Sequence, residues 1–145
     1  MDDFQAIETL HTSGVYQKRD LTIVRGMGAR VWDENGHEYI DCISGHGAAN
    51  LGHCHPAVVT AVEKQAAHLI TCPEVFHNDQ RAQLLARLTS VAPGEMQRAY
   101  LCNSGAEAVE AAFKFARIST GRAEVISTLR SFHGRTMGAL TLTGQ

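Results

Sequence analysis

Residues 98–127 read RAYLCNSGAEAVEAAFKFARISTGRAEVIS, and the fold class follows from the order of patterns in this stretch. The short β-prone run 98–102 predicts a strand, and the alanine-rich run 106–119 predicts a helix that ends before Gly121. A second β-prone run at 124–127 predicts another strand. A strand, a crossover helix and a strand imply a parallel pair, and so predict an α/β sheet that is covered by helices.

The turn that joins the first of these strands to the helix has the features of an anion site. Backbone N–H groups at a helix N-terminus lack helical partners and lie at the positive end of the helix dipole. Gly105 lets the backbone approach closely, Ser104 adds a hydroxyl, and Ala106 leaves the entrance uncrowded. These residues favour a phosphate, although a plain N-capped turn would show the same residues. Neither a mononucleotide P-loop nor a dinucleotide fingerprint is present.

A second turn, at residues 131–136, follows the second predicted strand. Adjacent parallel strands end at the same edge of a sheet, so this turn is predicted to lie near residues 104–106. Phe132 then offers a ring for stacking, and Arg135 offers a planar guanidinium to a carboxylate. The alternative is that Phe132 is a core aromatic residue and Arg135 a solvated surface charge. Together the two turns describe a site for a phosphorylated aromatic cofactor that handles an amino acid.

Upstream, the sequence predicts a small β-meander followed by two helices. Residues 21–42 contain β-prone runs on either side of Asn35-Gly36, which is a strong hairpin signal. One helix is predicted over 56–70, and another begins with Asn78 or Asp79 as its N-cap. We expect the apolar stripes of both helices to face a core. The stripe residues are Val58, Val62, Ala66, Leu69 and Ile70 in the first helix, and Leu84, Leu85, Leu88 and Val91 in the second.

Composition excludes several classes of protein. The 145 residues carry 13 Lys and Arg against 15 Asp and Glu, a formal net charge of −2, and 44% of them are hydrophobic. This balance is too apolar for a disordered tail and too neutral for a general nucleic-acid binder. No apolar run approaches the roughly 18–20 residues that span a membrane. The acidic first 14 residues also lack the basic and apolar regions of a secretory signal.

Cysteine and histidine usage indicates a cytoplasmic protein without a metal. The four cysteines form no C-x-x-C pair, and their density is too low for a disulfide framework, so we expect reduced thiols. They are Cys42, Cys54, Cys72 and Cys102. Residues 53–55 (His-Cys-His) lie near His46, but adjacent residues rarely point at one ion, and usual zinc ligand spacings differ.

Four motifs, in chain order, resemble those of the class III (ornithine/acetylornithine-type) aminotransferases. They are a β-meander at 28–41, Gly-His-x-His-Pro at 52–56, a phosphate-binding turn and helix at 103–117, and Phe-His-Gly-Arg-Thr at 132–136. The subgroup that looks nearest is acetylornithine aminotransferase, together with its relative that acts on lysine attached to a small amino-group carrier protein. Residues 13–18 and Asp41-Cys42 favour that relative.

The resemblance implies a fold-type I enzyme that depends on pyridoxal 5′-phosphate. Residues 1–55 would be the N-terminal segment of the small domain, and residues 56–145 the start of the large cofactor-binding domain, with its parallel or mixed sheet. The implied reaction moves an amino group from acetylornithine, ornithine or carrier-bound lysine to 2-oxoglutarate, in arginine or lysine biosynthesis. A homodimer with shared active sites is implied as well, and the carrier protein is a further expected partner.

The same resemblance assigns roles to individual residues. Gly105 and Ala106 would bind the cofactor phosphate with Ser104 beside them, and Phe132 would stack on the pyridine ring. Arg135 would hold the α-carboxylate of the amino-acid substrate. The residues expected to line the substrate entrance are Ser44, Gly45 and His46.

Three neighbouring residues receive structural expectations only. His53 and His55 match the family motif, and we expect them to act structurally at a helix start. The Glu107 carboxylate suits a helix N-terminus, but it is expected to point away from the phosphate.

No lysine of the chain is suited to form the Schiff base that transamination needs. The lysines are Lys18, Lys64 and Lys114, and Lys114 lies roughly 15 Å along the helix from Ser104. By resemblance, the catalytic lysine, the aspartate at the ring nitrogen and a phosphate-binding threonine of the partner subunit all lie beyond Gln145. The chain is therefore predicted to be an N-terminal fragment of roughly a third of the enzyme, inactive alone.

Two other hypotheses remain open from the sequence. One is a non-catalytic module that binds a phosphate or metabolite with the same turn. The other is a small zinc protein built on His46, His53, Cys54 and His55.

Overall fold

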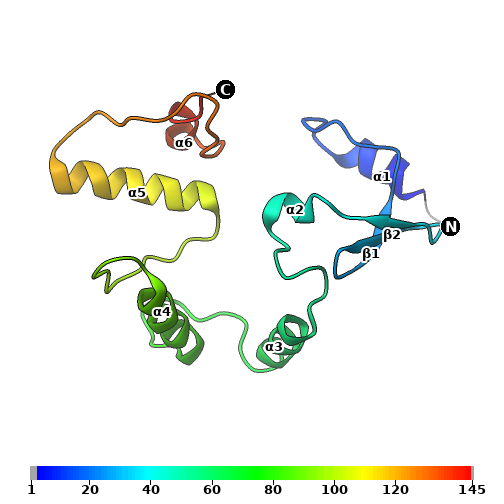
Figure 1. Ribbon diagram of the computed structural model, residues 1–145, viewed down its shortest axis with the longest axis horizontal. Coiled ribbons are helices and arrows are strands. Elements are labelled where there is room, and N and C mark those ends of the chain that lie inside the picture. Colours follow the sequence, from blue (N-terminus) through cyan, green and yellow to red (C-terminus); the bar gives the residue numbers. More distant parts are fainter. Residues whose placement is uncertain (1–2, 145) are drawn as a thin grey trace. The chain divides into compact units, whose positions relative to one another are not determined.

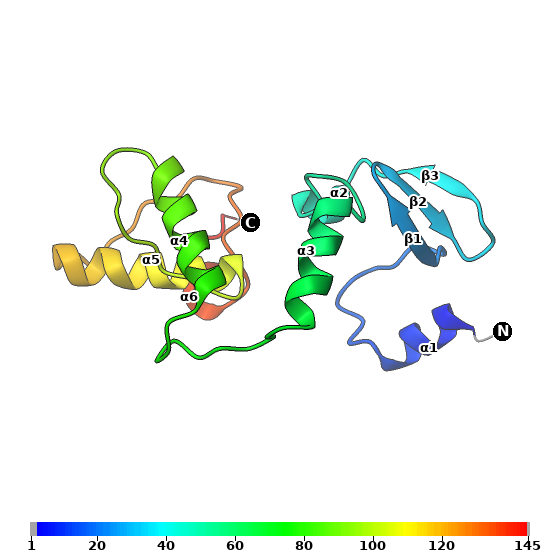
Figure 2. The same cartoon turned by 90° about the horizontal axis from the view of Figure 1, so that it is seen from below.

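The computed structural model describes residues 3–144, and the chain divides into two compact units, one up to Pro73 and one from Glu74. The first unit contains α1 (Phe4–His11), β1 (Ile23–Met27), β2 (Arg30–Asp33), β3 (Glu38–Ile40), α2 (Ser44–Gly47) and α3 (Pro56–Ala66). The second contains α4 (Asp79–Val91), α5 (Gly105–Thr120) and α6 (Met137–Thr141). Figure 1 shows the helices with β1 and β2 along the chain, and Figure 2 also labels β3.

The first unit is built around an antiparallel three-stranded sheet of order β1-β2-β3, which confirms the predicted meander (Figure 2). The β2–β3 hairpin turns at Asn35-Gly36 and is held by Asp33, which is 95% buried. The Asp33 carboxylate accepts hydrogen bonds from the backbone of His37 at 2.8 Å and from the Tyr39 hydroxyl at 3.0 Å. Burial works to raise the pKa of Asp33, but the hydrogen bonds from His37 and Tyr39 outweigh it and leave the pKa below its ordinary value.

Two helices form where the sequence predicts them. α4 has Asn78 as its N-cap, whose side chain accepts a hydrogen bond from the backbone of Arg81 at 2.9 Å. α3 begins at Pro56 as expected, but it ends at Ala66 and not at residue 70. The Gln65 side chain donates to the carbonyl of Leu69 at 2.8 Å, and this bond holds the chain after it has left the helix.

The strands predicted at 98–102 and 124–127 are wrong. Within residues 3–144 both segments are irregular, and no parallel pair forms around α5. A strand is stable only when neighbouring backbone pairs with its N–H and C=O groups. Neither segment has such a neighbour here, so β-prone composition alone does not make them strands.

The expectation that the apolar stripes of α3 and α4 face a core is also wrong for this chain. Val62 is 61% exposed and Leu84 is 48% exposed. Among the described residues, Ala139 is the one fully buried apolar side chain. Periodicity predicts which face of a helix is apolar, but it does not supply the partner that covers the face.

Candidate active site

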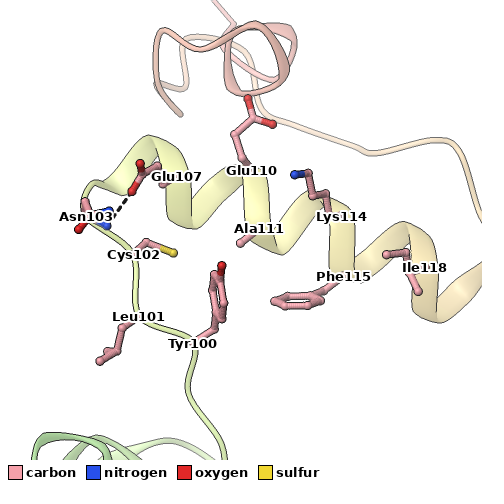
Figure 3. Close-up of a pocket in the computed structure, with 10 residues that line it drawn as sticks. All are labelled: Tyr100, Leu101, Cys102, Asn103, Glu107, Glu110, Ala111, Lys114, Phe115 and Ile118. Carbon is pink, nitrogen blue, oxygen red and sulfur yellow. Dashed lines mark hydrogen bonds between the residues drawn. The ribbon is translucent and has the colours of Figure 1, made fainter. Parts of the chain in front are cut away.

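Two side chains cap the N-terminus of α5. Ser104 is the N-cap, and its Oγ accepts a hydrogen bond from the backbone N–H of Glu107 at 3.2 Å. The Glu107 carboxylate reaches back and accepts from the backbone N–H of Asn103 at 2.7 Å (Figure 3). This reciprocal arrangement is a capping box, displaced by one residue from its usual form. The sequence signal for it is the serine followed three residues later by a glutamate.

The turn at 132–136 packs directly against this helix end. Gly134 approaches Ala106 so closely that a Cβ on residue 134 would lie 2.8 Å from the Ala106 Cβ and 3.0 Å from the Ala139 Cβ. Its φ of +140° is also unfavourable for other residues. Glycine is therefore required at position 134 for the turn to rest on the helix.

An open cavity of about 640 Å³ lies between the helix end and the turn. It is lined by Gly105, Ala106, Val109, Phe132, His133, Gly134, Arg135 and Thr136. The structure thus brings together four of the residues that the sequence singled out, which come from two separate motifs. Ser104 caps the helix next to this cavity and does not line it.

Phe132 and Arg135 both remain accessible from the cavity. Phe132 is 55% exposed, so it is not a core aromatic residue in this chain. The Arg135 guanidinium carbon lies 5.4 Å from the centroid of the Phe132 ring, within the range of a cation–π contact. An exposed ring and a planar cation therefore stand side by side at the mouth of the cavity.

The turn is held to α5 by Glu110, a residue that the sequence reading missed. Its Oε1 accepts a hydrogen bond from the Thr136 hydroxyl at 2.5 Å and from the backbone N–H of Ala139 at 3.0 Å. The Thr136 hydroxyl, followed by the Ala139 amide, holds the pKa of Glu110 below its ordinary value. Glu110 lies four residues after Ala106, and so on the same helix face, which is the one available sequence signal.

The segment that carries the turn closes on itself. The backbone N–H of Arg130 donates to the carbonyl of Gly144 at 2.9 Å, and the N–H of Gly144 donates to the carbonyl of Ser131 at 3.1 Å. The Ser131 hydroxyl adds a bond to the carbonyl of Leu142 at 3.1 Å. Residues 130–144 therefore form a closed loop of the Ω type, whose entrance and exit are adjacent.

Ser44, Gly45 and His46 belong to α2 in the first unit. The dihedral angles of Gly45 and His46 are not those of an α-helix, so this segment is a left-handed turn. The φ values of the three residues are +50°, +59° and +57°, a conformation that residues other than glycine seldom adopt and that is very unusual in succession. Residues 44–55 are rich in glycine, but nothing in the sequence pattern indicates this handedness.

Asp41 holds the left-handed turn in place. Its Oδ1 accepts hydrogen bonds from the backbone N–H groups of Ile43 at 2.8 Å and Ser44 at 2.9 Å, and its Oδ2 lies 2.6 Å from His53 Nε2. The hydrogen bond from His53, followed by those from Ser44 and Ile43, lowers the pKa of Asp41 to about 2. The side chains of His53 and Asp41 are 29% and 14% exposed, so this pair is largely shielded from solvent.

The Gly-His-x-His-Pro segment attaches this turn to the sheet. His53 and Gly28 exchange two backbone hydrogen bonds, of 2.8 and 2.9 Å. The carbonyl of His55 accepts from the N–H groups of Val58 and Val59 at the start of α3, both at 3.0 Å. The structure thus gives His53 and His55 local structural contacts. No group of three or more metal-ligating side chains occurs within residues 3–144.

A second hollow lies along another face of α5, at Tyr100, Cys102, Lys114 and Phe115 (Figure 3). The rings of Tyr100 and Phe115 meet edge to face there, with centroids 5.7 Å apart. Lys114 lines this hollow and is not among the residues that line the cavity of the 132–136 turn.

Comparison with known families identifies this arrangement of motifs. The sequence model for aminotransferase class-III matches residues 13–145. The chain belongs to the class-III aminotransferase family. Within residues 3–144, no helix of this family member is long and apolar enough to cross a membrane.

Two curated class-III aminotransferases are close in sequence. The chain is 53% identical over 138 residues to the [LysW]-aminoadipate semialdehyde transaminase of Deinococcus radiodurans, covering 95% of this chain and 32% of that protein. It is 45% identical over 143 residues to the acetylornithine aminotransferase of Methanopyrus kandleri, covering 99% of this chain and 36% of that protein. The chain therefore spans about a third of the length of these relatives.

Solved aminotransferase structures match the fold of the chain. The taurine:2-oxoglutarate aminotransferase of Bifidobacterium kashiwanohense, in complex with PLP and glutamate, gives a TM-score of 0.87 at 31% identity. The match covers 99% of this chain and 34% of that one. The acetylornithine aminotransferase of Elizabethkingia anophelis gives 0.74 at 36% identity, covering 79% of this chain and 28% of that one.

The residues of the cavity suit part of pyridoxal phosphate, the cofactor of class-III aminotransferases. The helix N-terminus at Gly105 and Ala106 suits a phosphate, and the exposed Phe132 ring suits the face of an aromatic ring. Gly134 has no Cβ to separate the turn from Ala106, so the Phe132 ring stays next to the helix N-terminus.

Proposed function

We propose that this chain supplies the phosphate-binding and carboxylate-binding part of a pyridoxal-phosphate-dependent aminotransferase. The observation that carries the proposal is the cavity that joins Gly105 and Ala106 to Phe132 and Arg135 in a member of the class-III family. Gly105 and Ala106 would hold the phosphate with Ser104 beside them, and Phe132 would stack on the ring. When bound, the cofactor supplies an electron sink for transfer of the amino group.

Arg135 is proposed to bind the α-carboxylate of the amino-acid substrate. A guanidinium pairs with a carboxylate through two parallel hydrogen bonds, which orients the substrate as well as holding it. The same guanidinium would bind the carboxylate of 2-oxoglutarate in the second half of the reaction. Ser44, Gly45 and His46 are proposed to line the substrate entrance, where the rigid left-handed turn would present their backbone in one conformation.

The proposed amino donors are acetylornithine, ornithine or carrier-bound lysine, in arginine or lysine biosynthesis. The names of the relatives at 53% and 45% identity support this choice. We further propose that the protein is cytoplasmic, which the free state of all four cysteines suits, and that it forms a homodimer. Residues 1–55 would belong to its small domain and residues 56–145 to its large domain. The catalytic lysine would lie outside this chain, which alone would be inactive.

The test uses the full-length protein that contains this chain. Purified protein is titrated with pyridoxal phosphate, and the visible absorption of the bound cofactor is recorded. Turnover with 2-oxoglutarate is then compared for acetylornithine, ornithine and the carrier-bound donor. Cofactor binding with turnover of one of these donors is the expected result. Binding of pyridoxal phosphate without turnover of any amino donor would favour a non-catalytic binding module and contradict the proposal.

A further inference from the structure

Glu110 joins two elements that are distant in the sequence. It projects from α5 toward the α6 segment and away from Tyr100 and Phe115 (Figure 3). Thr136 is the N-cap residue of α6, yet its own side chain makes no capping bond. Glu110 supplies the cap from the other helix by accepting from the Thr136 hydroxyl and from the backbone N–H of Ala139.

This contact fixes the residues on both sides of Arg135. Gly134 rests on Ala106 of α5 through close van der Waals contact, and Thr136 is hydrogen-bonded to Glu110 of the same helix. Arg135 lies between them, so its backbone is restrained relative to the α5 N-terminus from either side. At the start of the turn, Thr143 Oγ1 accepts from the backbone N–H of His133 at 3.2 Å.

We propose that Glu110 is a positioning residue, which sets the place of Arg135 relative to the α5 N-terminus although it does not line the site. The inference rests on the proposed function, because the substrate role of Arg135 is itself proposed. Binding and turnover of the amino acid then depend on the bond between Glu110 and Thr136. A displacement of about 1 Å in a substrate-holding group can reduce the rate roughly a hundredfold.

The chemistry of the contact requires a side-chain acceptor at position 110. Glu110 faces the Thr136 hydroxyl and the backbone N–H groups of Ala139 and Gly138, all of which are donors. The Thr136 hydroxyl and the Ala139 N–H both donate to Oε1, so this single acceptor oxygen joins the two groups. The one charged side chain that adds to this environment is Lys114, one turn further along α5.

The experiment compares variants of the full-length holoenzyme. Glu110→Ala removes the carboxylate, Thr136→Val removes the hydroxyl with little change of shape, and Thr136→Ser keeps the hydroxyl as the matched control. For each, KM and kcat for the amino donor, the affinity for pyridoxal phosphate and the thermal midpoint are measured. Hydrogen exchange of residues 134–139 in the cofactor-free protein reports the contact independently of activity.

We expect Glu110→Ala and Thr136→Val each to reduce kcat/KM by about tenfold or more, mainly through KM, with a much smaller change in cofactor affinity. Thr136→Ser keeps the hydroxyl and should therefore have the wild-type KM. The kcat/KM of the double variant should be no lower than that of the more impaired single variant, because each single change already removes the same interaction. Faster hydrogen exchange at residues 134–139 should accompany the loss.

Two results would overturn the proposal. One is a wild-type KM in both single variants, even with a lowered thermal midpoint, which would make the contact merely structural. The other is full additivity in the double variant. If Glu110→Ala does not fold, Thr136→Val decides the question through the same bond. If the wild-type protein neither binds the cofactor nor turns over a donor, this inference and the proposed function both fail. If the wild-type protein does both and the two single variants keep its KM, this inference alone fails.

Discussion

Neighbouring residues of the 132–136 turn have different physical roles. Phe132 exposes its ring, Gly134 has no side chain and so can contact α5, and Arg135 places its charge beside the Phe132 ring. A substitution at each position therefore changes a different quantity. In the proposed site, loss of the ring would affect stacking and loss of the guanidinium would affect carboxylate binding, whereas a side chain at 134 would move the turn off α5.

Arg135→Ala in the full-length enzyme should weaken the amino-acid substrate and leave cofactor binding nearly intact. Charge-assisted hydrogen bonds contribute about 1.5–3 kcal/mol, so kcat/KM should fall by about tenfold to a hundredfold. Steady-state kinetics and a cofactor titration measure the two effects. Arg122→Ala, just after α5, removes an exposed arginine outside the cavity and serves as the control. Equal loss of substrate and cofactor affinity would contradict the carboxylate role.

Asp41 should make the protein sensitive to acid. Its pKa of about 2 lies below the ordinary value of 3.8, so its contribution to stability is complete above that ordinary value and is lost as the pH falls through about 2. Asp41→Asn should therefore lower the thermal midpoint at pH near 5, with a difference from wild type that shrinks as the pH falls. Thermal unfolding of the full-length protein from pH near 5 down to pH near 3 tests this. Asp20→Asn, at an exposed position, is the control. A difference that does not change with pH would contradict it.

The elements that the sequence predicted well are those determined by local interactions. The Asn35-Gly36 hairpin, the Asn78 cap of α4 and the Ser104 cap of α5 each depend on residues within a few positions of one another. The strands at 98–102 and 124–127 failed because a strand needs a partner from elsewhere. Gly105, Ala106, Phe132 and Arg135 were predicted to meet, and they do so without those strands.

Other features of the site depend on distant contacts, which a sequence pattern does not contain. Glu110 reads as an ordinary polar residue of a helix, and only the folded turn reveals its bonds to Thr136 and Ala139. The left-handed turn at Ser44–His46 depends on Asp41 and on His53, which is anchored to the sheet. Such strained conformations persist because surrounding contacts over-determine them.

The join between the sheet and the segment before α3 should be intolerant of any side chain at Gly52. Its φ is +84°, and a Cβ there would lie 2.9 Å from the Gly28 Cα. Gly52→Ala should therefore cost more than the roughly 1–2 kcal/mol of left-handed strain alone. Gly47→Ala is the matched control, because its φ is also +84° and no atom lies within 4 Å. Chemical denaturation of both full-length variants measures the difference, and equal destabilisation would contradict the predicted clash.

At the scale of the whole molecule, the described part of the chain exposes many large apolar side chains. Side chains such as Ile118, Ile126 and Leu129 are 80%, 98% and 92% exposed. The chain spans about a third of the length of its relatives. We infer that the remaining two thirds of such an enzyme would cover these faces and supply the missing neighbours of the predicted strands.

The isolated chain of residues 1–145 should therefore behave as an incompletely packed protein. We expect strong binding of a hydrophobic dye, a broad thermal transition and no transaminase turnover, because little apolar surface is buried to stabilise it. The full-length protein should bind little dye and unfold sharply. Dye fluorescence and near-ultraviolet circular dichroism compare the two. A sharp, cooperative transition in the isolated chain would contradict this prediction.

The closed loop at residues 130–144 has an internal geometry that depends on its own hydrogen bonds. Its entrance and exit are joined by the bonds between Arg130, Ser131 and Gly144, and its interior is held to α5 by the Gly134 contact with Ala106 and by the Glu110 bonds. Insertions or deletions in the connection before it would alter the approach of the chain and leave the internal geometry of the loop unchanged. We therefore expect changes in this connection to leave the loop in place on α5, as long as position 110 keeps its acceptor and position 134 its glycine.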